Sequence, residues 1–478
     1  MLFSAYTLGC KLNQLETEAI TDAFSRGAFT LVPLDAKPDL VVINTCTVTS
    51  MAEQKARRLI RKILREQSQA FIIVTGCYAQ LNKEEIAALG EKSNGRLFIV
   101  PGEKKDRILD LPAFLATPCQ LAPGENPSAL GRALELALEA AGSENNADNL
   151  AAVAGVDRSF RFAPETFSSH SRAFLKIQDG CDRRCTYCRV SLARGKSRSL
   201  GAKEVLGQLK TLESRGFTEA VLTGVNISQY RDLEFSDKPL GLPQLLDFLL
   251  KETSRIRLRL SSIEPDLLAG NNANTIGEDF FQVLTNERIR PHFHLSLQSG
   301  SAGILARMAR PYTPEDVERG IKNLRLVRND PFLACDIIAG FPGETDAEFE
   351  KTLEFCRKNS FAWIHAFPFS PRPGTAASSF PDKVSEREAV IRVKTLTELA
   401  LEGRRQYIHR WLGKEVEAVA EAGTTQDSIP AVSENYLKLL INCTEEPPPP
   451  PGSILRCRLL CAQTGRFDAL AEITELRG

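Results

Sequence analysis

The sequence has no net charge and few cysteines for its length. Its 478 residues include 60 Lys and Arg and 60 Asp and Glu, so no protein-wide field would attract nucleic acid. Any contact with RNA must therefore come from local basic patches. Twelve cysteines are too few for a scaffold built on disulfides.

Long hydrophobic runs are also absent. No uncharged run reaches about 18 residues, and we therefore expect no membrane span. The first residues, MLFSAYTLGCKLNQLE, lack a charged segment followed by a long apolar one, so we expect no signal peptide. These absences predict a soluble, cytoplasmic protein. The length allows about three domains.

Three of the cysteines are crowded into one short segment. Cys181, Cys185 and Cys188 have the spacing CxxxCxxC and follow an apolar run, 173–177, with Gly180 between. A tight loop can direct three thiolates at one soft metal centre, an iron–sulfur cluster, zinc or Cu(I). Three ligands leave one iron of a four-iron cluster open, as catalysis requires. The alternative is half of a zinc site whose fourth ligand lies elsewhere, for which His170 is one possibility.

Residues 1–110 predict a parallel α/β domain. Strands are expected at 3–8, 39–44, 71–75 and 96–100, with helices at 14–26 and 51–66. Cys10, Cys46 and Cys77 each follow one of the first three strands. Ligands of open parallel sheets bind beyond the carboxyl ends of the strands, so these cysteines can converge on a second cluster with an open iron. The alternative for each alone is a small buried residue.

Residues 111–169 lose this alternation and are predicted to be an insertion and linker, with a short helix at 132–141. Residues 170–402 then predict a partial (β/α)6 barrel, with strands at 173–177, 219–223, 256–260, 292–297, 333–339 and 361–367. Residues 403–478 predict a small β-barrel.

Polar residues and glycines occur at the carboxyl ends of the predicted barrel strands, where the catalytic residues of such barrels lie. Hydroxyls, amides and a carboxylate there could bind a ribose and an amino-acid group, whereas some of these residues could simply form turns. The candidates are Thr223, Gly224, Asn226, Ser296, Gln298 and Asp336.

Taken together, these segments resemble the methylthiotransferases of the radical S-adenosylmethionine (SAM) superfamily. The resemblance is carried by 7–14 (TLGCKLNQ), 44–49 (NTCTVT), 75–77 (TGC), 178–188 (QDGCDRRCTYC), 222–226 (LTGVN), 294–300 (HLSLQSG) and 338–344 (IAGFPGE). It implies an N-terminal cluster domain, a radical SAM barrel and a C-terminal TRAM-like domain. It also implies two [4Fe–4S] clusters, one on Cys10, Cys46 and Cys77 and one on Cys181, Cys185 and Cys188. Tyr187 fits the second motif, and the polar candidates would bind SAM.

Within that family, 8–13 (LGCKLN) and 193–198 (ARGKSR) are most similar to the bacterial subgroup that acts on N6-threonylcarbamoyladenosine at tRNA position 37. The implied chemistry is reductive SAM cleavage, hydrogen abstraction from adenine C2, insertion of sulfur from the second cluster, and methyl transfer from a second SAM. The implied partners are the tRNA anticodon loop and a low-potential electron donor such as a flavodoxin or ferredoxin.

Other functions remain open at this point. The long insertion, residues 189–192 (RVSL) and the weakly basic tail depart from the family pattern. The same chemistry could act on isopentenyladenosine-37 in tRNA or on an aspartate of a ribosomal protein. A zinc-stapled RNA-binding protein without catalysis is the alternative of a different class.

Overall fold

The computed structural model describes residues 1–27, 29–115, 127–140, 157–164, 171–235, 237–269, 276–423, 427–443 and 448–477. The chain forms two compact units. The first unit contains Met1–Ser168, Asp179–Asp182 and Cys188–Leu200, and the second contains Ser169–Gln178, Arg183–Tyr187 and Gly201–Gly478. His170 and much of the predicted insertion lie outside the described residues.

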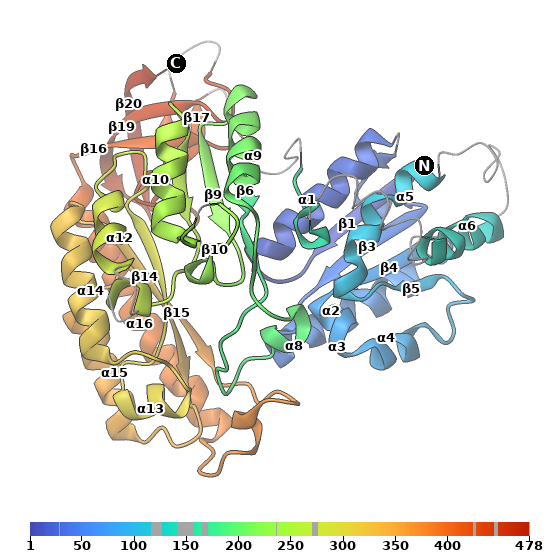
Figure 1. The fold of residues 1–478 in the computed structure, drawn as a ribbon, viewed down its shortest axis with the longest axis horizontal. Coiled ribbons are helices and arrows are strands. Elements are labelled where there is room, and N and C mark those ends of the chain that lie inside the picture. Colours follow the sequence, from blue (N-terminus) through green and yellow to red (C-terminus); the bar gives the residue numbers. More distant parts are fainter. Residues whose placement is uncertain are drawn as a thin grey trace. The chain divides into compact units, whose positions relative to one another are not determined.

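The first unit is built on a five-stranded parallel sheet (Figure 1). Its strand order is β2 (Thr30–Leu31), β1 (Leu2–Thr7), β3 (Leu40–Thr45), β4 (Phe71–Gly76) and β5 (Leu97–Ile99). Almost every residue of β3 and β4 is buried, because helices cover both faces of a parallel sheet. The predicted parallel α/β domain is confirmed. The short edge strand β2 was not predicted.

Alternate residues of β3 point into two separate cores. Leu40 and Val42 pack with α1 (Lys11–Arg26), α5 (Leu111–Leu115) and α6 (Pro127–Ala140). Val41 and Ile43 pack with α2 (Ser50–Glu66), α3 (Cys77–Leu81) and α4 (Lys83–Gly90). The helix α6 confirms the one expected from the sequence near residue 132. Thr49 caps α2 by accepting a hydrogen bond from the Ala52 N–H at 3.1 Å.

The second unit contains the partial barrel. Its strands are β6 (Ala173–Lys176), β9 (Glu219–Thr223), β12 (Arg257–Leu260), β13 (His292–Gln298), β14 (Phe332–Ala339) and β15 (Trp363–Pro368). They form two three-stranded parallel sheets, which the bridges Leu258–Ile289 and Ile263–Leu295 join side by side. All six strands were predicted. The helices between and after them are α9 (Ala202–Ser214), α10 (Leu242–Glu252), α11 (Asp266–Ala269), α12 (Ile276–Leu284), α13 (Ala302–Arg307), α14 (Pro314–Val327), α15 (Asp346–Lys358) and α16 (Glu386–Trp411).

The tail of the chain closes into a five-stranded barrel, as expected. Its strands are β16 (Glu415–Ala420), β17 (Ser428–Ser433), β18 (Lys438–Asn442), β19 (Ile454–Ala462) and β20 (Ala469–Arg477). The helix α16 was not predicted and spans the boundary that we drew at residue 402. Tyr407 and Trp411 at its end share one apolar core with Phe332 of β14 and with the closed barrel.

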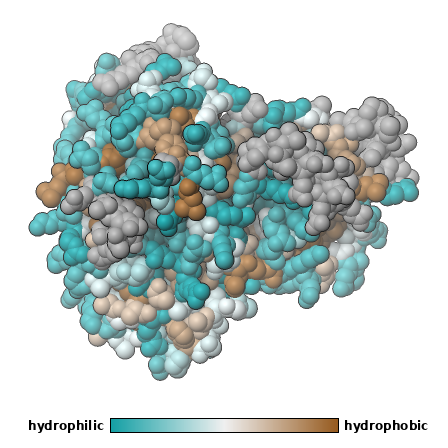
Figure 2. All heavy atoms as spheres, in the orientation of Figure 1, coloured by the Kyte–Doolittle hydropathy of each residue, from teal (hydrophilic) through white to brown (hydrophobic). Residues whose placement is uncertain are grey.

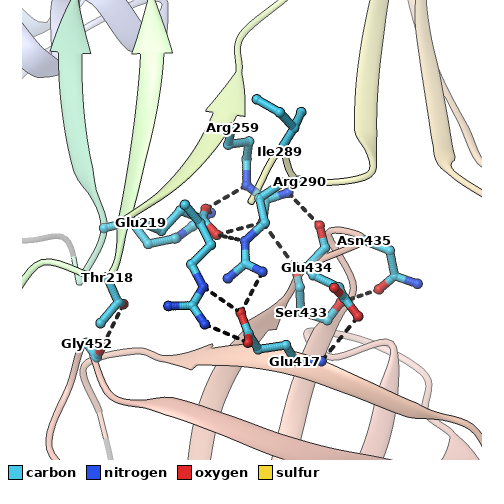
Figure 3. Close-up of polar contacts among 12 residues, drawn as sticks. Thr218, Glu219, Arg259, Ile289, Arg290, Glu417, Ser433, Glu434, Asn435 and Gly452 are labelled. Carbon is cyan, nitrogen blue, oxygen red and sulfur yellow. Dashed lines mark hydrogen bonds and ion pairs between the residues drawn. The ribbon is translucent and has the colours of Figure 1, made fainter. Parts of the chain in front are cut away.

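A buried ionic network fixes the closed barrel to the amino ends of the barrel strands (Figure 3). Glu219 opens β9 and pairs with Arg259 at 2.6 Å and Arg290 at 2.7 Å, and all three side chains are buried. Arg290 also reaches Glu417 of β16 at 2.7 Å, and Arg259 donates to the carbonyl oxygen of Ser433. Burial would raise the pKa of Glu219, but the two guanidinium groups hold it well below its ordinary value.

We expect Glu219→Gln to lower the free energy of unfolding of the second unit by about 3–5 kcal/mol, because it removes the anion that buried Arg259 and Arg290 share and leaves Arg290 with Glu417 alone. Chemical denaturation of the full chain measures the effect. The control is Glu252→Gln, which breaks an exposed pair with Lys210 and should cost about 0–1 kcal/mol. Equal losses for the two variants would contradict the role of the network.

Among the described residues on the face shown in Figure 2, hydrophilic ones predominate and hydrophobic ones form small groups. Among the described residues, no helix is both long enough and apolar enough to cross a membrane.

Candidate functional site

The first unit brings three cysteines to one edge of its sheet. Cys10 precedes α1, Cys46 follows β3, and Cys77 opens α3 directly after β4. The strands β1, β3 and β4 pair in parallel, with Thr7 opposite Asn44 and Thr45 opposite Gly76. All three cysteines therefore lie at the carboxyl end of the sheet, as the sequence predicted.

Glycines before two of these cysteines allow the backbone segments to approach each other. Gly9 has φ +121°, and a Cβ there would lie 2.6 Å from Cβ and 3.0 Å from Sγ of Cys46. Gly76 has φ +96°, and a Cβ there would overlap the carbonyl oxygen of Thr45. A side chain at either position would displace the segment that carries Cys46, which explains both Gly-Cys pairs.

Asn13 holds the strand ends in place. Its Nδ2 donates to the carbonyl oxygen of Leu8 at 2.9 Å and to that of Thr45 at 3.1 Å, next to Cys46. Its Oδ1 accepts a hydrogen bond from Arg194 at 2.9 Å. Asn13 belongs to the motif at 7–14, but nothing in its spacing shows which carbonyl groups it reaches.

The three thiols share one environment. Burial, together with the neighbouring thiols of Cys10 and Cys77, raises the pKa of the Cys46 thiol to about 12, although the Val48 N–H lies 3.5 Å from its sulfur. A bound metal centre would reverse this shift, because a coordinating thiol is deprotonated. Two buried acceptors at the ends of β3 and β4, Asn44 Oδ1 and Thr75 Oγ1, have no hydrogen-bond partner.

These features fit a cluster that thiolates hold at the sheet edge, since soft thiolates are the ligands that iron–sulfur clusters use. As the side chains lie, no group of three or more His, Cys, Asp or Glu among the described residues is arranged to hold a metal ion. The case for an iron–sulfur cluster here therefore depends on the three thiols as ligands and on the strand ends that bring them to one edge of the sheet.

A buried ion network lies beside this triad. Arg194 pairs with Glu16 at 3.0 Å and with Asp179 at 3.1 Å, and Lys105 pairs with the other oxygen of Glu16. All four side chains are nearly inaccessible to solvent. The network joins α1, which follows Cys10, to Asp179, which precedes the CxxxCxxC loop. Sequence reasoning missed Glu16 and Lys105, because their pairing joins residues 89 positions apart.

The CxxxCxxC loop is divided between the two units: Cys181 and Cys188 belong to the first, and Cys185 to the second. Within the first unit, the Cys181 N–H donates to the carbonyl oxygen of Gly195 at 3.1 Å. Gly180 has φ +70°, and a Cβ there would overlap the carbonyl oxygen of Lys196. Only glycine fits at this position.

We expect Gly180→Ala to reduce the iron that the chain holds after anaerobic reconstitution. The left-handed backbone costs alanine about 1–2 kcal/mol, and the overlap with Lys196 displaces Cys181 in addition. The control is Gly207→Ala in α9, where a Cβ meets no atom within 4 Å. Iron and sulfide analysis should separate the two variants, and equal iron contents would refute the expectation.

In the second unit, the segment around Cys185 is attached to the barrel. The Thr186 N–H donates to the carbonyl oxygen of Met308 at 3.2 Å, and its Oγ1 donates to that of Arg307 at 2.9 Å. Tyr187 packs edge-on against Phe341, with 6.5 Å between the ring centroids. The predicted residue Tyr187 therefore lies against the glycine-rich segment that follows β14.

The predicted polar residues lie on or directly after three strands of the barrel, β9, β13 and β14. Thr223 ends β9, and the Asn226 N–H donates to Gln178 Oε1 at 2.8 Å, with Gly224 packed on Gln178 as well. Ser296 and Gln298 lie on β13, and Gln298 has φ +71°, which is unusual for a residue other than glycine. Such backbone strain is concentrated at binding sites.

Asp336 lies in the middle of β14, one strand from β13, and belongs to a polar chain. Its Oδ1 is 3.0 Å from His294 Nε2, and His294 Nδ1 is 3.1 Å from Ser262 Oγ. His365 of β15 follows, with 5.1 Å between the two imidazole centroids. Period-two alternation could have shown that these side chains share the inner face, but not that they touch.

Comparison with known proteins adds two family models. One, described as "Uncharacterized protein family UPF0004", matches residues 3–95, and the model of the Radical SAM superfamily matches residues 175–356. The first covers Cys10, Cys46 and Cys77, and the second covers the CxxxCxxC loop and four of the six barrel strands in full.

Curated relatives match over most of the chain. The threonylcarbamoyladenosine tRNA methylthiotransferase MtaB of Treponema pallidum (strain Nichols) is 38% identical over 473 residues, 91% of this chain and 93% of that protein. The protein of the same name from Bacillus subtilis (strain 168) is 30% identical over 98% of this chain and 97% of its own length. The tRNA-2-methylthio-N(6)-dimethylallyladenosine synthase of Neorickettsia sennetsu is 31% identical over 87% of this chain and 82% of its own length.

Proposed function

Because this chain belongs to the radical SAM methylthiotransferases and matches members named as tRNA methylthiotransferases, we propose that it inserts a methylthio group at C2 of N6-threonylcarbamoyladenosine at tRNA position 37. The observation that carries the choice of nucleoside is the match, over nearly the whole chain, to relatives named for that nucleoside. The relative named for dimethylallyladenosine matches less of the chain, and that nucleoside is the second candidate.

Methylthiotransferases of this family carry two [4Fe–4S] clusters and use SAM. We assign one cluster to Cys181, Cys185 and Cys188 and the other to Cys10, Cys46 and Cys77. The assignment of the second is supported by the three parallel strand ends and by the two glycines that let those segments approach. When bound, SAM and its cluster supply a radical, and the second cluster supplies sulfur.

The side chains of the barrel would bind SAM and orient it. Thr223, Gly224, Asn226, Ser296 and Gln298 offer hydroxyl, amide and backbone groups to the ribose and amino-acid parts of SAM. Asp336 offers a carboxylate that His294 holds at 3.0 Å, so its orientation is fixed before a ligand arrives. A second SAM would supply the methyl group.

The partners follow from this chemistry. The macromolecular substrate is tRNA, through its anticodon loop, and a low-potential flavodoxin or ferredoxin would supply the electron. These partners support a cytoplasmic location for the reaction.

Nucleoside analysis of tRNA tests the proposal. In a strain that lacks the gene, we expect the 2-methylthio form of threonylcarbamoyladenosine to disappear and threonylcarbamoyladenosine itself to accumulate. The 2-methylthio form of isopentenyladenosine serves as the internal control and should not change. Unchanged levels of the first nucleoside with loss of the second would favour the second candidate.

Metal analysis separates this enzyme from a zinc-stapled RNA-binding protein. Two four-iron clusters give about eight irons per chain after anaerobic reconstitution. Stable zinc with no brown absorbance would instead support the protein without catalysis.

A further inference from the structure

Arg310 has its guanidinium group against the sulfur of a proposed cluster ligand. Its Nη1 donates to Sγ of Cys185 at 3.2 Å, and both residues belong to the second unit. The side chain of Arg310 is 2% exposed and Cys185 is partly buried, so the guanidinium group is largely shielded from water. Arg310 is not among the residues that the sequence analysis selected.

The other donors of Arg310 are also bound, which fixes the guanidinium in one orientation. Nε donates to Tyr312 Oη at 2.7 Å, and Nη2 donates to the carbonyl oxygen of Ser296 at 2.9 Å and to a carboxylate oxygen of Glu264. Tyr312 Oη in turn donates to the carbonyl oxygens of Ser296 and Leu297. The guanidinium thus joins the end of β13, the segment after β12 and the cysteine loop.

The backbone before Arg310 is shaped for this contact. Ala309 has φ +57°, a left-handed conformation that costs a residue with a Cβ about 1 kcal/mol or more. The same turn accepts the hydrogen bonds of Thr186, the residue after Cys185, through the carbonyl oxygens of Arg307 and Met308. Backbone and side chain of one turn therefore hold residues 185 and 186 together.

We propose that Arg310 is a positioning residue for the SAM cluster: it fixes the Cys185 thiolate and, through its charged N–H···S hydrogen bond, raises the reduction potential of that cluster. The proposal rests on the proposed function, which assigns Cys185 to the cluster. Reduction adds negative charge, and a cation held against a ligand sulfur in a water-excluded site stabilises the reduced form. Hydrogen bonds to the sulfurs and the net local charge are known to set the potentials of such clusters.

A variant of Glu264 can distinguish an electrostatic effect of Arg310 on the reduction potential from a purely structural role of Arg310. Glu264 pairs with the same guanidinium group. Its negative charge has the opposite effect on the reduction potential from the positive charge of Arg310. Removing the cation should make the cluster harder to reduce, whereas removing the anion should make it easier to reduce. Loss of packing alone would move both variants in the same direction.

The test uses the full chain carrying Cys10→Ala, Cys46→Ala and Cys77→Ala together, so that only the SAM cluster contributes to the signal. Its reduction potential is measured by electron paramagnetic resonance titration, with iron content and thermal unfolding recorded in parallel. We expect Arg310→Gln to lower the ratio of reduced to oxidised cluster at a given potential about tenfold, which is a shift of about 59 mV for a one-electron couple. Glu264→Gln should shift the potential in the opposite direction.

Two further variants complete the test. Arg310→Lys keeps the charge without the planar fork, so its potential should lie between those of the parent and Arg310→Gln, and it serves if the glutamine variant does not load iron. Arg319→Gln removes an exposed arginine of α14 and should change nothing. An unchanged potential in Arg310→Gln and Arg310→Lys, or shifts of one sign in the Arg310 and Glu264 variants, would overturn the proposal. A parent chain that holds no SAM-cleaving cluster would overturn the proposed function itself.

Discussion

Cys185→Ala is expected to abolish reductive cleavage of SAM. A three-thiolate cluster that loses one ligand can no longer hold its open iron in place, and loss of even an outer partner of a metal site costs about 10–100-fold. Formation of 5′-deoxyadenosine with a chemical reductant measures the reaction, and we expect a loss of at least about 100-fold.

The fold should survive this change. Alanine is smaller than cysteine, Cys185 is only partly buried, and Thr186 remains attached to the turn at Arg307 and Met308. The matched control is Cys461→Ala, which removes an exposed cysteine of the closed barrel and should leave cleavage unchanged. Cleavage by Cys185→Ala at the rate of this control would remove Cys185 from the proposed cluster.

Cys46→Ala is expected to separate the two halves of the reaction. SAM cleavage should remain measurable, because the ligands of the first cluster are intact, while insertion of the methylthio group stops. The iron content after reconstitution should fall from about eight to about four per chain. Analysis of 5′-deoxyadenosine and of the tRNA nucleoside from the same reaction gives both readings.

A packing control is needed because Cys46 is 5% exposed. Cys443→Ala removes a cysteine that is 6% exposed, from the core of the closed barrel, and leaves a cavity of similar size. We expect it to keep both activities. If Cys46→Ala forms the full amount of product, the second cluster does not depend on Cys10, Cys46 and Cys77.

Buried arginines lie at both ends of the barrel strands. Arg259 and Arg290 lie at the amino ends and bind the closed barrel, where residues of such folds contribute to stability. Arg310 follows α13, beyond the carboxyl end of β13, and contacts Cys185. Arginine therefore stabilises the fold at the amino ends of the strands and, in the proposal, positions a cluster ligand at the carboxyl ends.

The sequence by itself determined most of the strands and the positions of the thiols along the chain. The strands that precede Cys10, Cys46 and Cys77 are local apolar runs, and the spacing from Cys181 to Cys188 is a property of eight consecutive residues. Parallel pairing then follows from the alternation of strands and helices, and it brings the three strand ends to one edge. Hence the fold class could be predicted from the sequence alone, and the two sets of cysteines could be selected as candidate cluster ligands.

Only the tertiary structure decided which polar side chains meet. Arg310 and Cys185 are 125 positions apart, His294 and Asp336 are 42 apart, and Arg194 and Glu16 are 178 apart. The spacing of charged residues along the sequence does not predict their ion-pair partners. A buried charge needs a partner, and only the folded chain brings the two residues together. For the same reason the long helix α16 escaped prediction: its buried residues face β15 and the closed barrel, and neither surface exists until the chain has folded.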